Sequence, residues 1–394
     1  MTARRRVTVA ERRARLGRRH HLAPACRAAD PVSLARSLAG LHGTDPPGVF
    51  IAAWARLDGF RVEQLEHALY EERSLTKHLC MRRTLFVLPD DVRAEAQSAA
   101  SDAVAANERR KLIADVEAGG ITDDGAAWLR VATQAALDGI ARLGSPTGSQ
   151  LTRAVPELQA KLTVGEGKKW GGTVGVTTRV LTILSAEGRI RRGRPASWTS
   201  SRHRWEPARP LSDLPDAATA TTGLVRRWLA AFGPGTETDL AWWTGLGLLK
   251  VRAALAALGV VEVDVELGDG TVSTGYLLSD DLDRVTSPGP WAAFLPWLDP
   301  ATMGWKQRDW YVGPHADAVF DTAGNGGPTV WWNGRIVGGW AQLPDGAVVH
   351  RLLEDVGSDA GRAIERRGAQ LQAWLDGTVV VPRFPAPLEK ALRA

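Results

Sequence analysis

The feature that most constrains this chain is an order of elements that occurs repeatedly: segments with helical periodicity are followed by two short β-rich runs with a turn between them. In the first occurrence of this order, Asp30 stands where it can cap the first helix. The expected elements of this unit are helices over residues 31–41, 48–57 and 62–70 and β-rich runs over residues 75–80 and 84–88. Helices followed by a basic two-stranded wing form a winged helix, a variant of the helix-turn-helix. The start of the chain is therefore predicted to be a winged helix.

The same order returns twice, although the copies share no obvious sequence repeat. The expected elements of the second unit are helices over residues 147–153 and 173–187, a further helical segment that includes residues 158–162, and a wing over residues 189–205. Gly188 stands where a helix-ending glycine belongs. The expected elements of the third unit are helices over residues 223–232, 239–244 and 248–258, with Thr236 as a cap, and a hairpin over residues 260–267 and 272–278. The pattern thus predicts three tandem units.

Two further regions complete the predicted organisation. Residues 90–143 are dominated by helix formers and broken at Gly119-Gly120, which indicates a helical connector. After Trp291, strand-like runs alternate with turns, among them Asn333-Gly334, and a helix follows over residues 359–375. This part predicts a small β-barrel or sheet. The fold class is therefore α+β, with these expected domains: winged helix 1 (residues 1–90), helical connector (91–144), winged helix 2 (145–210), winged helix 3 (211–288), and a small β-barrel with the C-terminal helix (289–394).

Composition and motifs exclude several classes of protein. The two cysteines, Cys26 and Cys80, form no CxxC pair and no zinc-type spacing with the eight histidines. No Walker loop, Rossmann glycine pattern, HExxH or serine-elbow motif is present. The basic N-terminus is not followed by an apolar signal core, and no window approaches the roughly 18 apolar residues of a membrane span. We therefore expect a cytoplasmic monomer with no cofactor, no metal and no membrane contact.

Positive charge is concentrated in two places. The net charge is +5 and the pI about 9.4, and arginines gather within residues 1–21 and within residues 188–205. Clustered arginine indicates a polyanionic partner, although a solvated basic face is the alternative for either cluster. Because the second cluster lies on a predicted wing, nucleic acid is the favoured partner. Several of the 16 tryptophans lie beside charges, where they can stack on bases; core packing is the alternative for each of them.

Five segments, taken in order, carry a resemblance to a known family. They are LAGLHGTDPP from Leu38, MRRTLFVLP from Met81, LTILSAEGRI from Leu181, LPWLDPATMGWKQRDWY from Leu295 and GPTVWWNGRIVGGW from Gly327. This ordered set resembles the AlkZ/YcaQ-type winged-helix DNA glycosylase superfamily over nearly the whole chain. The resemblance implies three winged-helix units and a C-terminal β-barrel that wrap duplex DNA as a C-shaped clamp. It also implies kinship with antibiotic self-resistance enzymes that release adducts from DNA.

The catalytic motif of this family is Gln-x-Gln or Gln-x-Asp at the end of an early helix, and the resemblance places it on His42 and Thr44. Both positions are polar here, but neither keeps its family identity, and Asp45 follows directly. Hydrolysis of an alkylated, cationic base requires a held water and a stabilised, oxocarbenium-like sugar. His42 is predicted to accept the proton of that water, Thr44 to hold the water, and Asp45 to face the sugar with its charge. The alternatives are a structural His42 and an Asp45 that caps the next helix.

The predicted contacts with DNA are basic and aromatic residues of the two wings and of a loop between them. They are Lys77, His78, Arg82, Arg83, Lys168, Lys169, Trp170, Arg191, Arg192, Arg194, Trp198 and Arg202. Second-rank site candidates, in a loop that borders the site in the family, are Asp299, Trp305, Lys306 and Arg308. For this loop, an internal Asp–Arg structural pair is the alternative.

These interpretations together predict a monofunctional DNA glycosylase. Its expected substrate is double-stranded DNA with an alkylated purine, bulky antibiotic adducts included, and its expected role is base-excision repair or self-resistance. The first alternative is a DNA-binding protein without catalysis, such as a regulator or an adduct-binding protein, because the glutamine pair is missing. The second is a scaffold for protein contacts, since winged helices also pair with proteins.

Overall fold

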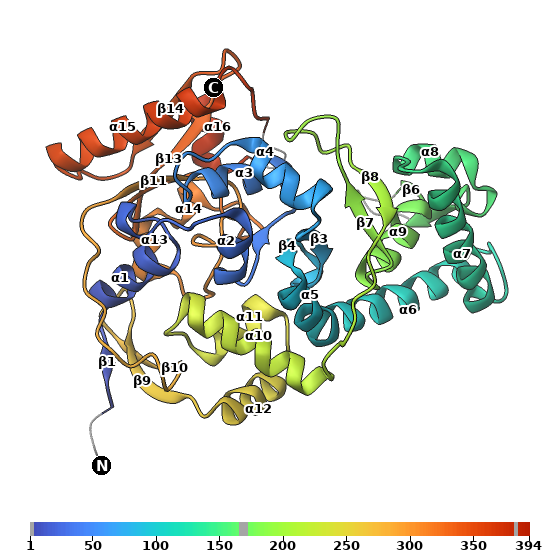
Figure 1. The fold of residues 1–394 in the computed structure, drawn as a ribbon, viewed down its shortest axis with the longest axis horizontal. Coiled ribbons are helices and arrows are strands. Elements are labelled where there is room, and N and C mark those ends of the chain that lie inside the picture. Colours follow the sequence, from blue (N-terminus) through green and yellow to red (C-terminus); the bar gives the residue numbers. More distant parts are fainter. Residues whose placement is uncertain (1–3, 165–171, 382–384) are drawn as a thin grey trace.

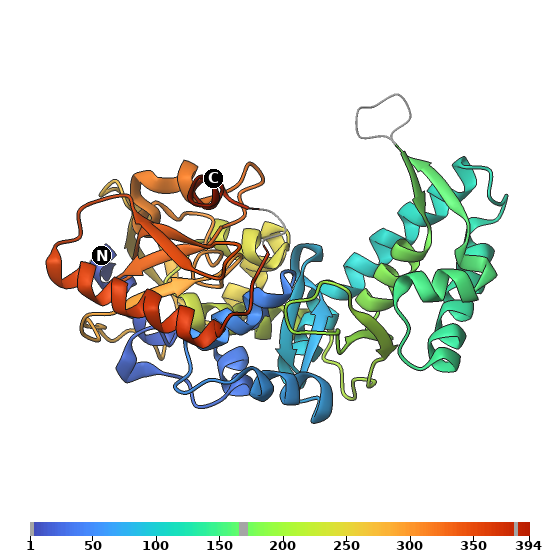
Figure 2. The same ribbon diagram turned by 90° about the horizontal axis from the view of Figure 1, so that it is seen from above.

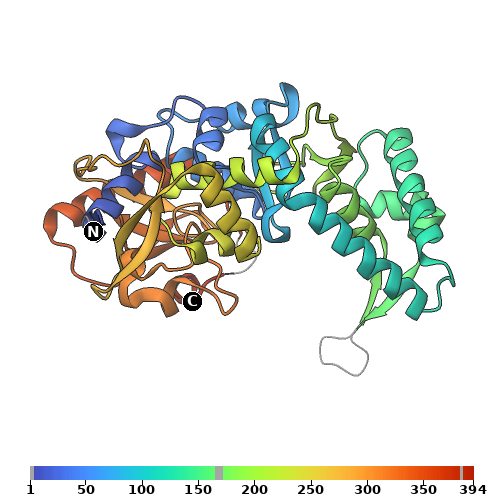
Figure 3. The same cartoon turned by 90° about the horizontal axis from the view of Figure 1, so that it is seen from below.

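The computed structural model describes residues 4–164, 172–381 and 385–394, which form a mixed α+β fold of many helices and several small sheets (Figure 1). Two lobes are visible when the molecule is turned (Figures 2 and 3). The larger lobe holds both chain ends, and the smaller one stands at the far end of the long helix α6 (Asp102–Ala118). Among the helices of the described residues, none combines the length and apolar character that crossing a bilayer requires.

The first unit has the predicted helices and hairpin, with one addition that replaces the end of the helix predicted over residues 31–41. Its elements are α2 (Pro31–Ser37), β2 (Leu41–His42), α3 (Pro46–Trp54), α4 (Val62–Glu66), β3 (Leu75–Leu79) and β4 (Leu85–Pro89). Asp30 caps α2 as expected, because its carboxylate accepts hydrogen bonds from the backbone amides of Val32 and Ser33. The addition is β2, which pairs antiparallel with β4 and gives a sheet in the order β2-β4-β3. A strand of two residues carries too short a pattern to be predicted.

Two long helices of the connector share one hydrophobic core with the second unit. The connector consists of α5 (Asp90–Ala96), α6 and α7 (Gly125–Leu143), and the break at Gly119-Gly120 lies where the sequence predicts it. Buried residues of α6 and α7, such as Leu112 and Leu129, pack with Leu151 and Leu184 of the second unit. This core is separate from the one that joins the first unit, the third unit and the C-terminal sheet. The helices α6 and α7 therefore pack as part of the smaller lobe.

Two predictions for the second unit are wrong: the helical segment that includes residues 158–162, and the start of the helix over residues 173–187. After α8 (Gly148–Ala154), residues 158–162 do not continue in a helix, because β5 (Lys161–Val164) and β6 (Gly172–Gly175) pair as an antiparallel hairpin before α9 (Thr177–Ala186) begins. The β-branched residues Thr163 and Thr173 lie opposite each other in this hairpin, and such residues favour strands. The predicted wing is present as β7 (Ile190–Gly193) and β8 (Arg204–Pro207).

The third unit follows its predicted order closely. Its elements are α10 (Ala217–Phe232), α11 (Glu237–Thr244), α12 (Leu248–Leu258), β9 (Val261–Glu266) and β10 (Val272–Leu277). Thr236 and Asp239 form a capping box at the start of α11. The first strand of the chain, β1 (Arg6–Val7), adds to β9 in parallel. The N-terminus thus completes a sheet whose other strands are remote in sequence.

The N-terminal arginine run is bound to the protein's own chain. On α1 (Val9–Arg19), Arg15 is 1% exposed and pairs with Glu11 and Asp281 (both 2.9 Å). Arg19 pairs with the same Asp281. These guanidinium groups lie between α1 and the end of the third unit, where their partners neutralise them. The prediction that this run marks a surface for a polyanion is therefore wrong for these arginines.

The C-terminal part is an open sheet, and the predicted barrel is not found in the part of the chain that the structure describes. β11 (Ala292–Leu295), β12 (Thr329–Trp332), β13 (Arg335–Gln342) and β14 (Val348–Leu352) pair antiparallel in that order, with β11 and β14 at the edges. Helix α15 (Ser358–Leu375) packs against β11 and β14, and α16 (Pro387–Arg393) packs against β13. The short helices α13 (Asp309–Val312) and α14 (Ala316–Val319) lie between β11 and β12 in the chain. Because helices cover the sheet, its apolar side chains are buried without closure.

Candidate active site

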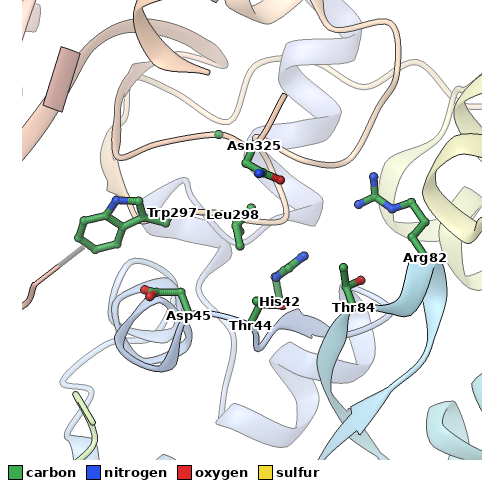
Figure 4. Close-up of a pocket in the computed structure, with 9 residues that line it drawn as sticks. His42, Thr44, Asp45, Arg82, Thr84, Trp297, Leu298 and Asn325 are labelled. Atoms are coloured by element: carbon green, nitrogen blue, oxygen red, sulfur yellow. The ribbon is translucent and has the colours of Figure 1, made fainter. Parts of the chain in front are cut away.

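A cavity of about 270 Å³ lies where the first unit meets the loops of the C-terminal sheet (Figure 4). Its lining comes from the β2–α3 turn, the β3–β4 turn, the loop after β11 and the loop before β12. The lining residues are His42, Thr44, Asp45, Arg82, Thr84, Trp297, Leu298, Asn325 and Gly326. The structure therefore brings the three predicted catalytic residues together in one cavity with one predicted DNA contact.

Local backbone structure directs residues 42–45 to this wall. Gly40 has a φ of 116°, which favours glycine, and a side chain there would collide with Leu88. This tight turn lets β2 pair with β4, and the backbone amide of Gly43 donates to the carbonyl oxygen of Leu85 (2.7 Å). The pairing ends there, so the chain leaves the sheet at the cavity before α3 begins.

His42 is a buried, neutral imidazole. The residue is 8% exposed, and its Nδ1 atom has no hydrogen-bond partner among the described residues. Burial lowers the pKa of His42 to about 3, and the nearby Arg82 guanidinium adds to the shift. The ring packs against Phe86, with 5.1 Å between the ring centres. A base with such a pKa is a weak proton acceptor at neutral pH, but its nitrogen can hold a water by a hydrogen bond.

Asp45 occupies the N-cap position of α3, but its side chain makes no capping hydrogen bond. The carboxylate instead lines the cavity, near Trp297 (Figure 4). Thr44 lies between Asp45 and His42, and its hydroxyl is 3.5 Å from the backbone nitrogen of Leu85, at the limit of a hydrogen bond. Of the two interpretations of Asp45, the geometry favours a charge at the site over a helix cap.

Trp297 of the cavity wall is hydrogen-bonded to Glu389, and neither residue was predicted as a site residue. Trp297 lines the cavity, and its indole Nε1 donates to a carboxylate oxygen of Glu389 on α16 (2.8 Å). Glu389 is 2% exposed, and its other oxygen has no hydrogen-bond partner among the described residues. Burial raises the pKa of Glu389 to about 7, and Asp45 contributes a smaller increase. Trp297 stands in a segment that carries the family resemblance, which could have identified it, whereas Glu389 stands in a short tail without a motif.

Glu389→Gln is expected to stabilise the protein above pH 7. The pKa of this carboxyl rises from its usual 4.5 to about 7 on folding, so protonation favours the folded state at low pH. That contribution is lost as the pH rises from 4.5 through about 7. At about 1.36 kcal/mol per pKa unit, the buried charge costs roughly 3 kcal/mol at pH 8. Glutamine avoids this cost and still accepts the hydrogen bond from Trp297. Urea unfolding of both proteins at pH 5 and pH 8 measures the difference.

The control for this prediction is Glu365→Gln, on an exposed position of α15. Its effect on the free energy of unfolding should be small and similar at both pH values. If Glu389→Gln is less stable than the parent at pH 8, the assigned cost of the buried charge is wrong.

Two predicted arginines reach the neighbourhood of the cavity and a third does not. Arg82 lines the cavity from the β3–β4 turn, and its guanidinium carbon lies 4.1 Å from the ring centre of Trp242. Arg308 lies over the same ring at 5.2 Å. Arg83, next to Arg82 in sequence, has an exposed side chain that pairs with Glu108 (3.2 Å). The turn thus separates two adjacent arginines, one at the site and one at the surface.

Lys77 and His78 are buried, so their prediction as DNA contacts is wrong. Lys77 is 8% exposed, and its Nζ donates to the hydroxyl of Tyr70 (3.1 Å). Burial lowers the pKa of Lys77 to about 8. His78 is 3% exposed, its Nε2 lies 3.0 Å from the hydroxyl of Ser101, and burial lowers its pKa to about 3. The neighbouring helices and the second wing cover β3, which the polar sequence of this strand did not reveal.

Two residues of the second wing make contacts between the two lobes. Their prediction as DNA contacts is therefore also wrong. Arg191 is 4% exposed and pairs with Glu206 (2.6 Å). Trp198 packs against Phe50 of α3 and Trp374 of α15, with 5.3 and 5.7 Å between ring centres. The contacts of Trp198 cross between the second unit and the larger lobe, as does a hydrogen bond from Arg191 to the carbonyl oxygen of Leu69 (2.9 Å). Short-range sequence patterns cannot anticipate such contacts.

The other candidates of the second unit remain at its surface. Arg194 is exposed and pairs with Glu71 (2.8 Å). Arg192 and Arg202 line a groove of about 690 Å³ beside α8, α9 and the wing. Hydroxyl groups are frequent in its lining: Thr147, Ser149, Thr152, Thr177, Thr178, Thr182 and Ser201. Arginine and hydroxyl side chains are typical ligands of DNA phosphates. The predicted contacts Lys168, Lys169 and Trp170 lie outside the described residues.

None of the four second-rank candidates is part of the cavity lining. Asp299 forms a fully buried ion pair with Arg56 (2.6 Å), so an internal Asp–Arg pair exists, but its arginine is not Arg308. Trp305 is 2% exposed and packs in the core. Lys306 is exposed, outside the cavity lining. The loop therefore supports the site through packing, and Arg308 alone among these four approaches it.

The chain is similar to known DNA glycosylases. The family model described as "DNA glycosylase AlkZ-like" matches residues 35–374. The solved structure of Streptomyces sahachiroi DNA glycosylase AlkZ is similar, with a TM-score of 0.69 and 20% sequence identity, over 96% of this chain and 98% of that chain. At this identity the likeness concerns the fold. No curated protein sequence matches the chain significantly.

Proposed function

Because this chain belongs to the AlkZ-like DNA glycosylase family, we propose that it hydrolyses the N-glycosidic bond of alkylated purines in duplex DNA, without a lyase step. The observation that carries the proposal is the cavity that His42, Thr44 and Asp45 line together. The family resemblance extends the proposed substrates to bulky purine adducts, such as those that antibiotics leave on DNA.

The chemistry follows from the charges at the cavity. A purine alkylated on a ring nitrogen is cationic and leaves readily, so the protein has to supply a water and a negative charge. The water oxygen bonds to C1′ as the bond from C1′ to the base breaks, and the bonding electrons leave with the base. The Asp45 carboxylate faces the cationic sugar and takes the proton that the water releases. His42, which is neutral because its pKa is lowered, holds the water, and Thr44 lies beside it. This proposal changes the role of His42 from proton acceptor to positioning group.

We also propose that the three helix–hairpin units are winged helices of a clamp that closes around duplex DNA. The order of elements supports this assignment, as does the smaller lobe, which projects from the larger one at the far end of α6 (Figure 2). The groove with Arg192 and Arg202 supports phosphate contacts by the second unit. The proposed domains are residues 1–90, 91–144, 145–210, 211–288 and 289–394, in a monomeric protein.

Single-turnover incubation with a duplex that carries one N7-methylguanine tests the activity, with alkaline cleavage to reveal abasic sites. The expected result is strand breaks at the modified base and none in the unmodified duplex. Tight binding without abasic sites would overturn the enzymatic proposal and favour a DNA-binding protein without catalysis. The observation in favour of that second candidate is that His42 and Thr44 stand where the family has glutamine or aspartate. Binding that does not weaken with salt would instead indicate a protein scaffold.

His42→Phe is expected to slow excision about tenfold and to leave DNA affinity nearly unchanged. Phenylalanine keeps a buried ring but removes Nδ1, and a hydrogen bond of this kind contributes roughly 0.5–1.5 kcal/mol. Because the pKa of His42 is about 3, the difference from the parent should be the same at pH 6 and pH 8. His42→Asn keeps an acceptor and is expected to recover part of the rate. Single-turnover rates at both pH values measure the effect, and equal rates for His42→Phe and the parent would remove His42 from the mechanism.

A further inference from the structure

Two arginines lie together over Trp242, and one of them, Arg82, lines the cavity at the end opposite Asp45. Arg82 comes from the β3–β4 turn and Arg308 from the loop before α13, and both guanidinium groups lie over Trp242 of α11. Arg308 also lies 4.4 Å from the ring centre of Phe320. Figure 4 shows Arg82 and Asp45 on opposite sides of the cavity. Segments that are remote in sequence thus place Arg82 at one end of the cavity, Arg308 beside Arg82, and the Asp45 carboxylate at the other end.

These two cations have no counter-charge in the part of the chain that the structure describes. Neither forms an ion pair there, and Arg82 Nε is buried without a hydrogen-bond partner. Arg308 donates to the carbonyl oxygen of Gly324 (3.3 Å), which carries no full charge. The pKa of Arg82 is lowered, first by burial and then by the charge of Arg308. An anion bound between the two guanidinium groups would remove this repulsion.

The backbone holds Arg82 at the cavity before any ligand binds. Arg82 and Arg83 have φ angles of 53° and 59°, which are uncommon for residues with a Cβ atom. The turn packs against Gly245, where a Cβ atom would lie 3.2 Å from the backbone nitrogen of Arg82. Backbone strain of this kind persists where surrounding contacts impose it and is frequent at ligand sites. The position of Arg82 is therefore set by the fold, and Trp242 supports its side chain.

We propose that Arg82, Arg308 and Trp242 form a subsite for one backbone phosphate of the DNA strand that carries the target nucleotide. The guanidinium fork matches the oxygens of a phosphate, and the face of an indole stabilises the cations that hold it. A phosphate at this end directs the sugar of that nucleotide toward Asp45, so the subsite sets the direction in which the strand enters. The inference rests on the proposed function in that its ligand is DNA.

The test combines an arginine variant with a phosphate that carries no charge. The probe is a duplex with 2′-fluoro-N7-methylguanine, whose fluorine prevents loss of the base, and a methylphosphonate replaces one phosphate at a time on either side of that nucleotide. For the parent protein, the replacement at one position is expected to weaken binding about tenfold or more. Arg308→Ala is expected to bind the fully charged duplex about tenfold more weakly and to lose the sensitivity at that position alone.

Two further variants control this test. Arg226→Ala removes an exposed arginine of α10 that pairs with Asp280 (3.3 Å), and it should keep the full sensitivity of the parent. Arg308→Lys keeps the charge without the fork and should keep part of the sensitivity, which separates loss of the contact from loss of the fold.

The outcomes distinguish this inference from the proposed activity. Equal sensitivity to position in the parent and in Arg308→Ala overturns the subsite, as does an affinity of the parent that no single replacement lowers. If the protein excises N7-methylguanine but Arg308→Ala does not change the sensitivity to a methylphosphonate at any single position, the subsite alone is rejected. A position-specific effect without excision rejects the glycosylase activity alone and leaves the phosphate subsite in place.

Discussion

Asp45→Asn is expected to slow excision of N7-methylguanine by about 10²- to 10³-fold. The carboxylate lines the cavity, where the proposed mechanism places it facing the sugar. A fixed charge aimed at a developing charge of opposite sign typically supplies an effect of this size. Asparagine keeps the shape of the side chain and removes the charge and the proton acceptor. Single-turnover rates of the parent and the variant on the same duplex measure the loss.

The effect on binding separates catalysis from DNA affinity. Loss of a negative charge beside a polyanion should leave affinity unchanged or raise it, which the 2′-fluoro duplex can report without turnover. The matched control is Asp58→Asn, whose side chain is 85% exposed and lies 3.8 Å from Arg27. It should excise at the parent rate. If the excision rate of Asp45→Asn lies within threefold of the parent rate, Asp45 has a structural role at the N-terminus of α3 and no role in catalysis.

Asp299→Asn is expected to lower the free energy of unfolding by about 3–5 kcal/mol, the usual result of removing one partner from a buried ion pair. Both side chains of the Arg56–Asp299 pair are fully buried, and two hydrogen bonds of 2.6 and 2.8 Å join them. The same carboxylate accepts the backbone amide of Ala301 (2.8 Å). Asparagine would leave the Arg56 charge in the core without a counter-charge. Urea unfolding at neutral pH measures the difference.

A surface pair provides the comparison for this prediction. The side chain of Asp359 is 89% exposed and pairs with Arg362, so Asp359→Asn should cost about 0–1 kcal/mol. Protein that remains folded with Asp299→Asn is expected to excise at close to the parent rate, because Asp299 does not line the cavity. Similar losses of stability in the two variants would contradict the structural role of Asp299. A large loss of excision in folded Asp299→Asn protein would indicate that Asp299 contributes to the active site.

These two predictions concern different parts of one arrangement. Arg56 follows α3, which begins after Asp45, and Asp299 follows Trp297 and Leu298 of the cavity wall. The buried pair therefore ties together the two segments that carry the wall. We expect excision to depend on the charge of Asp45 directly, and on the Arg56–Asp299 pair only through stability.

Local patterns predicted much of the secondary structure. The caps at Asp30 and Thr236 and the exact span of α12 follow from interactions within one or two helical turns. The β5–β6 hairpin was mistaken for helix because apolar and β-branched residues such as Val174 satisfy either period over so short a run. Strand-like runs were anticipated in the C-terminal part, but whether such strands close into a barrel depends on what covers them.

The order of helices and hairpins and the polar residues at 42–45 could be predicted from the chain alone, because caps, periodicity and turns depend on neighbours a few positions apart. The tertiary structure determined which charged side chains can contact a ligand. It buried Lys77 and Arg191, and it joined Trp297 to Glu389 across 92 positions and Arg56 to Asp299 across 243. Burial and pairing are properties of packed surfaces, and the energy of a charge depends on the groups that surround it in space. For that reason the sequence could name the residues with suitable chemistry, whereas only the packed structure determined which of them face the cavity.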